Sequence, residues 1–143
     1  MILVDTSVWV EELRETRSLP QLTLRRHLHR SSPIAITEPV VMELLAGART
    51  LGEHRAIRKR LLSFPMLRVH GLDTYERAAM IWRACRLGGE PVRNHLDCLI
   101  AAVAIREGVS VLHADRDFDA IARHTELRIE PVRRLGRRRR QEP

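Results

Sequence analysis

The sequence predicts a single α/β domain built on a short parallel β-sheet of about four to five strands, flanked by helices on both faces. Short apolar runs alternate along the chain with longer segments of helical periodicity, which is the pattern of parallel strands joined by crossover helices. A length of 143 residues fits one domain, and the 44% hydrophobic residues can form a core without disulfides.

Five short apolar segments are the candidate strands. They cover residues 2–4, 33–37, 67–70, 109–113 and 127–132. Strands that are buried on both faces of a parallel sheet read as continuous apolar runs of this kind.

The intervening segments carry helical periodicity and residues that favour helix ends. Pro39 suits the first turn of a helix, Asn94 can cap the start of another, and Gly108 can close it. The predicted helices cover about residues 7–13, 20–29, 39–47, 52–64, 73–88, 96–107 and 118–122.

The charge balance narrows the class of partner. The formal net charge is +7, and Lys59 is the single lysine, so arginine supplies the excess. Arginine binds phosphate through two parallel hydrogen bonds, so the excess suits a polyanionic partner. A general compositional preference for arginine explains the same charge equally well.

Cysteine content and apolar stretches indicate the compartment. Cys85 and Cys98 lack the spacing of zinc ligands, and we expect them to be small buried residues of a reducing compartment. Neither a signal peptide nor an apolar stretch of membrane-spanning length is evident, so we expect a cytoplasmic protein without membrane contact.

Residues 133–143 form a basic tail that we expect to be disordered, outside a domain over residues 1–132.

Acidic side chains follow two of the predicted strands. Asp5 ends the first strand, and Asp115 follows the fourth, with Asp117 and Asp119 close behind. Ligand sites in open α/β sheets form at the carboxyl ends of the strands, so these acids should meet at one edge. The alternative is that Asp5 and Asp115 or Asp117 only cap the helices that follow them.

Two further acids lie in apolar helical segments. Glu43 is surrounded by apolar neighbours, which predicts a buried helix and a costly carboxylate, unless Glu43 lies on a thin exposed stripe. Asp97 begins a helix with an apolar core face, where Asn94 and Asp97 could instead form a capping box.

A cluster of carboxylates is the site that Mg²⁺ or Mn²⁺ prefers. Such an ion lowers the pKa of a bound water and offsets charge on a leaving oxygen, so together with a basic surface it indicates hydrolysis of phosphodiesters. Phosphate-monoester hydrolysis is chemically possible as well. Phosphate-binding loops, dinucleotide fingerprints and nucleophile elbows are absent from the sequence.

Four blocks of sequence together resemble the PIN-domain ribonucleases, and in particular the VapC toxins of bacterial toxin–antitoxin pairs. The resemblance extends over essentially the whole chain to about Val132. The blocks are VDTSVW at 4–9, EPVVMELLAG at 38–47, DCLIAAVA at 97–104 and LHADRDFDAIA at 112–122.

The resemblance implies a set of site residues. Asp5, Glu43 and Asp97 match the three acidic positions of the family, and Asp115 matches the fourth, with Asp117 as the alternative. The implied catalytic residues are Asp5, Glu43, Asp97 and Asp115, and the implied metal ligands are Asp5, Asp97, Asp115 and Asp117. Thr6 or Ser7 matches the polar residue beside the first acid. With Thr6 and Ser7, we expect Arg93 and Arg116 to contact the substrate.

The resemblance also implies a function and partners. It implies an endoribonuclease toxin that depends on Mg²⁺ or Mn²⁺, forms a homodimer and is inhibited by a cognate antitoxin. An RNA-processing or DNA nuclease of the same fold is one alternative, and an inactive RNA-binding regulatory module is another. The complete acid set disfavours the inactive module. Apolar residues of the two N-terminal helices, with Trp9 foremost, are the predicted antitoxin contact, unless they belong to the core or to a dimer interface.

Overall fold

The computed structural model describes residues 1–132, which form a three-stranded parallel sheet and seven helices. The predicted basic tail, residues 133–143, lies outside the described residues. The strands are β1 (Ile2–Val4), β2 (Ile34–Ala35) and β3 (Ser110–Leu112). The helices are α1 (Thr6–Leu13), α2 (Leu19–His29), α3 (Glu38–Ala46), α4 (Leu51–Leu61), α5 (Gly71–Leu87), α6 (His95–Glu107) and α7 (Arg116–His124).

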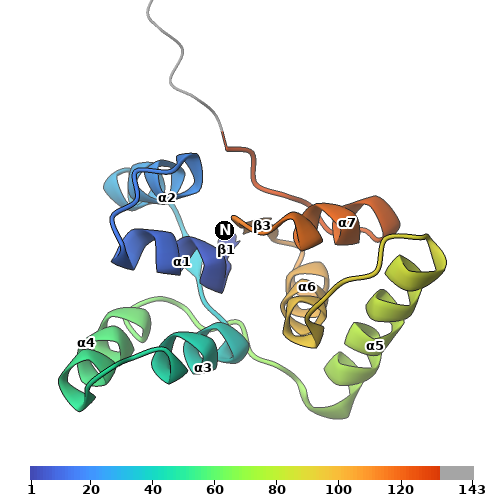
Figure 1. Cartoon of the computed structure of the whole chain (residues 1–143), viewed down its shortest axis with the longest axis horizontal. Helices are drawn as coiled ribbons and strands as arrows, with labels where there is room; N and C mark the ends of the chain where they lie inside the picture. The colour runs from blue at the N-terminus through green and yellow to red at the C-terminus, as the bar shows by residue number, and fades with distance from the viewer. Residues whose placement is uncertain (133–143) are drawn as a thin grey trace, which may run out of the picture.

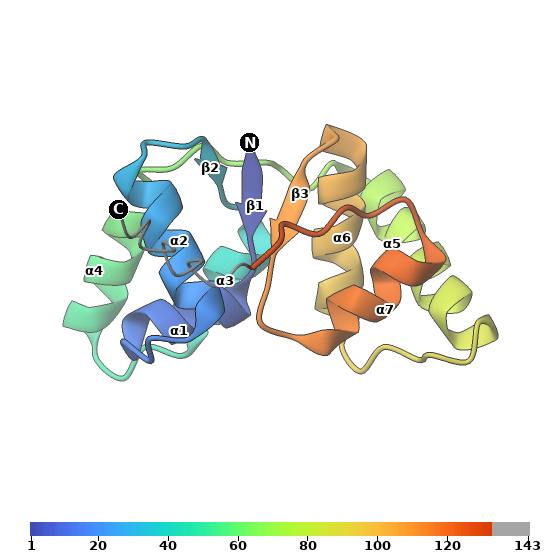
Figure 2. The same cartoon turned by 90° about the horizontal axis from the view of Figure 1, so that it is seen from above.

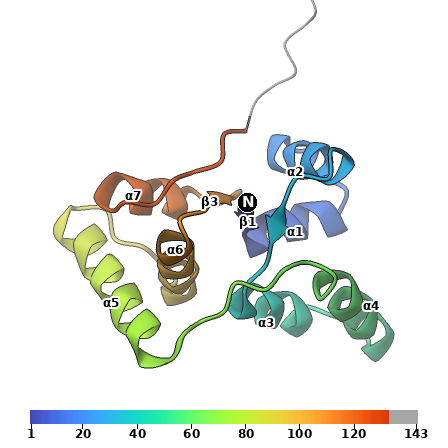
Figure 3. The same ribbon diagram turned by 180° about the vertical axis from the view of Figure 1, so that it is seen from behind.

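Strand β1 lies at the centre of the sheet, in the order β2-β1-β3. Ile2 pairs with Ile34 on one side and with Ser110 on the other. Helices α1 to α4 gather beside β2, and α5 to α7 gather beside β3 (Figure 2). Seen along the strands, α2 and α7 lie on one side of the sheet, and α3 and α6 lie on the other (Figures 1 and 3). The α/β class, the parallel sheet and its two helical layers are therefore confirmed.

The number of strands is lower than predicted, because two predicted strands are reduced to single bridges. Residues 67–70 are not a strand, and the sheet is extended there only by a parallel bridge between Ile36 and Met66. The amide of Val69 donates to a carboxylate oxygen of Glu38 instead of a neighbouring strand. Likewise residues 127–132 pair with β3 at Ile129 alone, where the amide of Glu130 donates to the carbonyl of Val111.

The predicted start and end of α6 agree with the structure. Asn94 caps α6 by accepting a hydrogen bond from the Leu96 amide at 3.0 Å, and Gly108 ends the helix in the left-handed region at φ +65°. Ser18 caps α2 in the same way, through the amide of Gln21. No helix within residues 1–132 is both long and apolar enough to span a membrane.

The core fills the space between the sheet and its helices, and it includes Trp9. The Trp9 side chain is only 1% exposed, and its ring centroid lies 5.5 Å from that of Phe64. Val8 and Leu24 are fully buried as well. The prediction that Trp9 forms an antitoxin contact is therefore wrong, because the apolar face of α1 packs inward.

Helix α3 is less buried than its composition predicted. Met42 is 53% exposed, and Ala46 is exposed too, so one face of this apolar helix meets solvent. Glu43 is partly buried at the border between the two faces.

A buried carboxylate that the sequence analysis passed over joins three helices. Glu12, on α1, accepts hydrogen bonds from Gln21 and Arg25 on α2 and from Arg60 on α4. The Arg60 guanidinium also lies 5.6 Å from the centroid of the Trp9 ring.

We expect Glu12→Gln to lower the free energy of unfolding by about 1.5–3 kcal/mol, since hydrogen bonds to a charged group contribute about this much. Both arginines are partly exposed and can turn to water, which favours the lower end of that range. Urea unfolding measures the effect. Glu15→Gln, at an exposed position of the same region, is the control and should change the value by under about 0.5 kcal/mol. Equal losses in the two variants would contradict a role for this network.

Candidate metal centre

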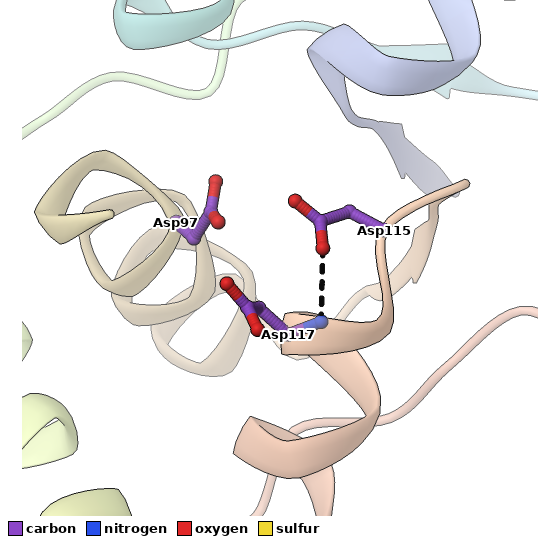
Figure 4. Close-up of side chains that lie close together, drawn as sticks. All are labelled: Asp97, Asp115 and Asp117. Atoms are coloured by element: carbon purple, nitrogen blue, oxygen red, sulfur yellow. Dashed lines mark hydrogen bonds between the residues drawn. The ribbon is translucent and has the colours of Figure 1, made fainter. Parts of the chain in front are cut away.

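Three carboxylates converge where α6 and α7 begin. Asp97 comes from the first turn of α6, Asp115 from the residue before α7, and Asp117 from its first turn. Each offers an oxygen, and these oxygens all lie within 4.8 Å of one another. Figure 4 shows the three side chains pointing toward a common space. The predicted meeting of acids from a strand end and a helix start is thus present for these three.

The local fold explains why Asp115 and Asp117 lie together. Asp115 caps α7, because its Oδ1 accepts the amide of Asp117 at 3.0 Å. The capping role raised as an alternative is therefore real, and it orients the carboxylate without removing it from the cluster. Asp117 itself is buried, and its Oδ2 accepts the backbone amide of Arg93 at 3.2 Å.

Arg93 is the counter-ion of this pair. Its Nε lies 3.0 Å from Oδ2 of Asp117, and its Nη2 lies 3.1 Å from Oδ1 of Asp115. The two carboxylates raise the pKa of the guanidinium above its usual value, Asp117 more than Asp115. Arg93 was predicted as a substrate contact, and in the structure it binds the acids themselves.

Asp5 ends β1 and caps α1. Its Oδ2 accepts the Ser7 amide at 3.0 Å and the Ser7 hydroxyl at 2.6 Å. Its Oδ1 is buried and has no hydrogen-bond partner among the described residues. Burial is the main cause of a raised pKa, which the hydrogen bonds from Ser7 counteract and the charge of Asp115 supports.

Glu43 reaches the same region from α3 through a neighbour of Asp5. The hydroxyl of Thr6 donates to Glu43 Oε1 at 2.9 Å. Partial burial raises the pKa of the Glu43 carboxyl, Thr6 lowers it, and the charge of Asp5 raises it further. Glu43 and Asp5 are outside the group of three, yet both carry charge that acts on Asp97.

The carboxyl of Asp97 has a strongly raised pKa. Its side chain is buried, and its Oδ2 has no hydrogen-bond partner within the described part of the chain. Burial, followed by the charges of Asp5, Asp115 and Glu43, raises the pKa of Asp97 to about 8. A carboxylate in this position lacks a balancing positive charge of its own.

The donor set fits a hard divalent cation. The oxygens are all carboxylate oxygens, the type that Mg²⁺ and Mn²⁺ prefer. Two buried oxygens, Asp5 Oδ1 and Asp97 Oδ2, have no hydrogen-bond partner within residues 1–132, and a bound cation would satisfy such atoms. Burial and then the neighbouring carboxylates raise the pKa of Asp97, and a cation at the cluster would favour its ionised form.

Of the other predicted substrate contacts, Thr6 and Ser7 are bonded within the protein, whereas Arg116 is exposed. Thr6 and Ser7 make hydrogen bonds within the protein, to Glu43 and Asp5, respectively. Ser7 also accepts the amide of Ala114 at 2.9 Å, which joins the end of β1 to the loop after β3. Arg116 is exposed at the start of α7.

Comparisons with known proteins agree with this fold and site. The PIN-domain family model matches residues 2–124. Ribonuclease VapC11 of Mycobacterium tuberculosis is 44% identical over 134 residues, which are 93% of this chain and all of that protein.

Two solved structures share the fold. The sarcin-ricin loop cleaving toxin VapC20 of M. tuberculosis superposes with a TM-score of 0.64 and 25% identity, covering 90% of this chain and 99% of that one. A toxin–antitoxin complex from Klebsiella pneumoniae superposes with a TM-score of 0.64 and 19% identity, covering 82% and 90%, respectively. The match of a family model to most of the chain, together with a full-length relative, shows that the chain belongs to the PIN-domain family, among the VapC ribonucleases.

Proposed function

We propose that this protein is an endoribonuclease toxin that hydrolyses RNA phosphodiester bonds with Mg²⁺ or Mn²⁺ at the acid cluster. The observation that carries the proposal is the convergence of Asp97, Asp115 and Asp117 in the region of Asp5, where two buried carboxylate oxygens lack partners in the described part of the chain. The resemblance to VapC toxins and the similarity to VapC11 support RNA as the substrate.

The chain's own residues prepare the site for this reaction. Asp97, Asp115, Asp117 and Asp5 would hold the cation. Glu43, which accepts the hydroxyl of Thr6 next to Asp5, would complete the catalytic acids Asp5, Asp97 and Asp115. When bound, the cation would supply an activated water and stabilise charge on the leaving oxygen. The cap of α7 and the Ser7 bridge hold the acids in place before any ligand arrives.

Arginine side chains at the rim of the site are proposed to hold RNA phosphates. Arg93 and Arg116 flank the cluster, from the loop before α6 and from the start of α7. A phosphate that approached a cation at the cluster would reach the Arg93 guanidinium, which is 63% exposed.

We expect Arg93→Ala to change two affinities in opposite directions. Its guanidinium competes with a cation for Asp115 and Asp117, so its loss should tighten Mn²⁺ binding by about fivefold at most, the value of an exposed ion pair. The same loss should weaken binding of a single-stranded RNA to a metal-loaded inactive protein and lower the salt slope by about 0.7.

Arg123→Ala is the control for this experiment. Arg123 is similarly exposed and also pairs with a carboxylate, that of Glu90, outside the cluster. If Arg93→Ala and Arg123→Ala give the same two affinities, Arg93 has neither role.

A groove on α1 and α2 is the proposed antitoxin contact. It has a volume of about 1000 Å³, and exposed Leu13 and Leu22 line it beside Leu19 and Leu28. Glu12, Arg25, Arg26 and Arg60 add charged groups to its walls. An amphipathic antitoxin segment would bury the leucines and find both signs of charge. The proposed surface thus keeps the predicted helices but excludes Trp9.

Helix α5 is the proposed surface for homodimer formation. Leu72, Tyr75, Ala79 and Trp82 follow one another at spacings of three and four residues, and the first three are exposed. Glu76 lies before the midpoint of α5 and Arg83 lies after it. If two copies of α5 packed antiparallel, Glu76 of each copy would lie near Arg83 of the other, so unlike charges would face each other.

One experiment tests the proposed function. The purified protein is incubated with total RNA and Mg²⁺ or Mn²⁺, with and without EDTA, and the new ends are mapped. Cuts that require the metal and recur at defined positions support a metal-dependent endoribonuclease with a specific RNA target. RNA that stays intact under all metal conditions would overturn the proposal.

A further inference from the structure

The loop between β3 and α7 is held by two side chains that do not belong to the acid cluster. His113 Nδ1 accepts the backbone amide of Asp115 at 3.1 Å. Ser7 Oγ accepts the amide of the preceding residue, Ala114, at 2.9 Å. Two successive amides of the segment that carries Asp115 are therefore fixed from outside the backbone.

The imidazole of His113 is itself held on three sides. Its Nε2 lies 3.1 Å from Oδ1 of Asp119, one turn into α7. Its ring stacks on Phe118 with centroids 5.4 Å apart, and the side chain is only 9% exposed. Rotation of the ring would break both polar contacts and the stacking together.

These contacts define the tautomer of the ring. Nδ1 must be without a proton in order to accept the Asp115 amide, so the proton of the neutral ring is on Nε2. Nε2 then donates to the carboxylate of Asp119, which stabilises this tautomer. Both ring nitrogens are engaged, so His113 has no free nitrogen with which to accept a proton from a substrate.

We propose that His113 is a positioning residue of the metal centre, and that Asp119 keeps its ring in the tautomer that holds the Asp115 amide. The proposal rests on the proposed function, in which Asp115 is a metal ligand. Fixing the amide of Asp115 fixes the start of its side chain. The carboxylate is thereby held where it caps α7 and lies within reach of Asp97 and Asp117.

The proposal separates Asp119 from the other acids of its segment. Asp117 points into the cluster, whereas Asp119 is about half exposed and bonds to His113. Asp119 thus affects the metal centre through the imidazole and not as a ligand. Such supporting partners of ligands, when removed, cost about 10- to 100-fold in metal affinity or activity.

Two substitutions of similar size at His113 separate the loss of the hydrogen-bond acceptor from the loss of the ring itself. His113→Asn puts an amide oxygen near the place of Nδ1, where it can accept the Asp115 amide as in an Asx turn. His113→Gln carries its polar group farther out, toward Asp119, and leaves that amide without its acceptor. We expect His113→Gln to weaken Mn²⁺ binding about 10- to 100-fold, and His113→Asn to bind close to the wild type.

Each purified variant is titrated with Mn²⁺, and the free Mn²⁺ is measured by electron paramagnetic resonance. Thermal unfolding of each variant confirms that the protein is folded. His29→Gln, at the exposed end of α2, is the control and should bind like the wild type. A second readout is the ¹⁵N spectrum of the His113 ring. It should show the Nε2-protonated tautomer in the wild type and a mixture of tautomers in Asp119→Ala.

The outcomes distinguish this inference from the proposed function. If Asp97→Asn leaves Mn²⁺ binding intact, the metal centre itself is wrong. If Asp97→Asn abolishes binding while His113→Gln matches the wild type, only the role of His113 is wrong. Equal weakening in His113→Asn and His113→Gln would also overturn it, because the amide acceptor would then not be the cause.

Discussion

Asp97→Asn is expected to lower the rate of RNA cleavage by about 10³-fold or more. A metal ion contributes several kcal/mol of charge stabilisation in the transition state, and each 1.36 kcal/mol is a factor of ten in rate. Asn is nearly the same size as Asp but cannot carry a negative charge, so the cluster loses a buried carboxylate without losing volume. Single-turnover cleavage of a defined RNA at saturating Mg²⁺ measures the effect.

A control variant and the unfolding temperature of Asp97→Asn show whether the loss of cleavage comes from the site or from loss of the fold. Glu126→Gln, at an exposed position after α7, is a control that should cleave at the wild-type rate. Asp97→Asn should unfold at or above the temperature of the metal-free wild type, because a destabilised carboxylate is removed. Cleavage within a few-fold of the wild-type rate, in a preparation free of contaminating ribonuclease, would rule out a cation held by Asp97.

The acid cluster could be anticipated from the sequence because it depends on local rules. Asp115 lies three residues after the end of an apolar strand, β3, and the carboxyl ends of parallel strands meet at one edge of a sheet. The same holds for Asp5 at the end of β1. Asp97 occupies the first turn of a helix with a recognisable cap. None of these positions required knowledge of a distant contact.

The sheet was harder to predict at its edges. Residues 67–70 are apolar enough for a strand, yet whether they pair depends on where the amide of Val69 finds its acceptor. That acceptor is the side chain of Glu38, which is distant in sequence. Apolar patterning records that a segment is buried, but it carries no information about its hydrogen-bond partner.

The same limit applies to Arg93 and Trp9. Arg93 was predicted as a substrate contact, and its partners in the structure, Asp115 and Asp117, follow more than 20 residues later in the sequence. Trp9 lies on a helix that packs against α2 and α3, so its apolar face is used within the domain. A surplus of apolar residues on a helix does not reveal how many neighbours that helix has.

The second large effect concerns pH. Without metal, the stability of the wild type should fall as pH rises from about 4 to about 8. The pKa of Asp97 is raised from 3.8 to about 8 in the folded protein, so the folded state binds a proton more tightly than the unfolded chain. This contribution is fully present below the unfolded pKa and is lost as pH rises through the folded value. Asp5 and Glu43, whose pKa values are also raised, act in the same direction.

The comparison with Asp97→Asn isolates the effect. Urea unfolding of both metal-free proteins from pH 5 to pH 9 should give a difference in favour of the variant. That difference grows with pH by at most about 1.4 kcal/mol per unit and levels off above pH 8. The lowered pKa of Glu90, about 2 beside Arg123 and His124, affects stability only in more acidic solution. Saturating Mn²⁺ should shrink this difference at pH 8, because it adds about 2.7 kcal/mol to the stability of the wild type at a hundredfold excess over Kd. Parallel pH profiles for the two metal-free proteins would mean that Asp97 is an ordinary solvated acid, because a buried anion cannot titrate at its usual pKa without a partner.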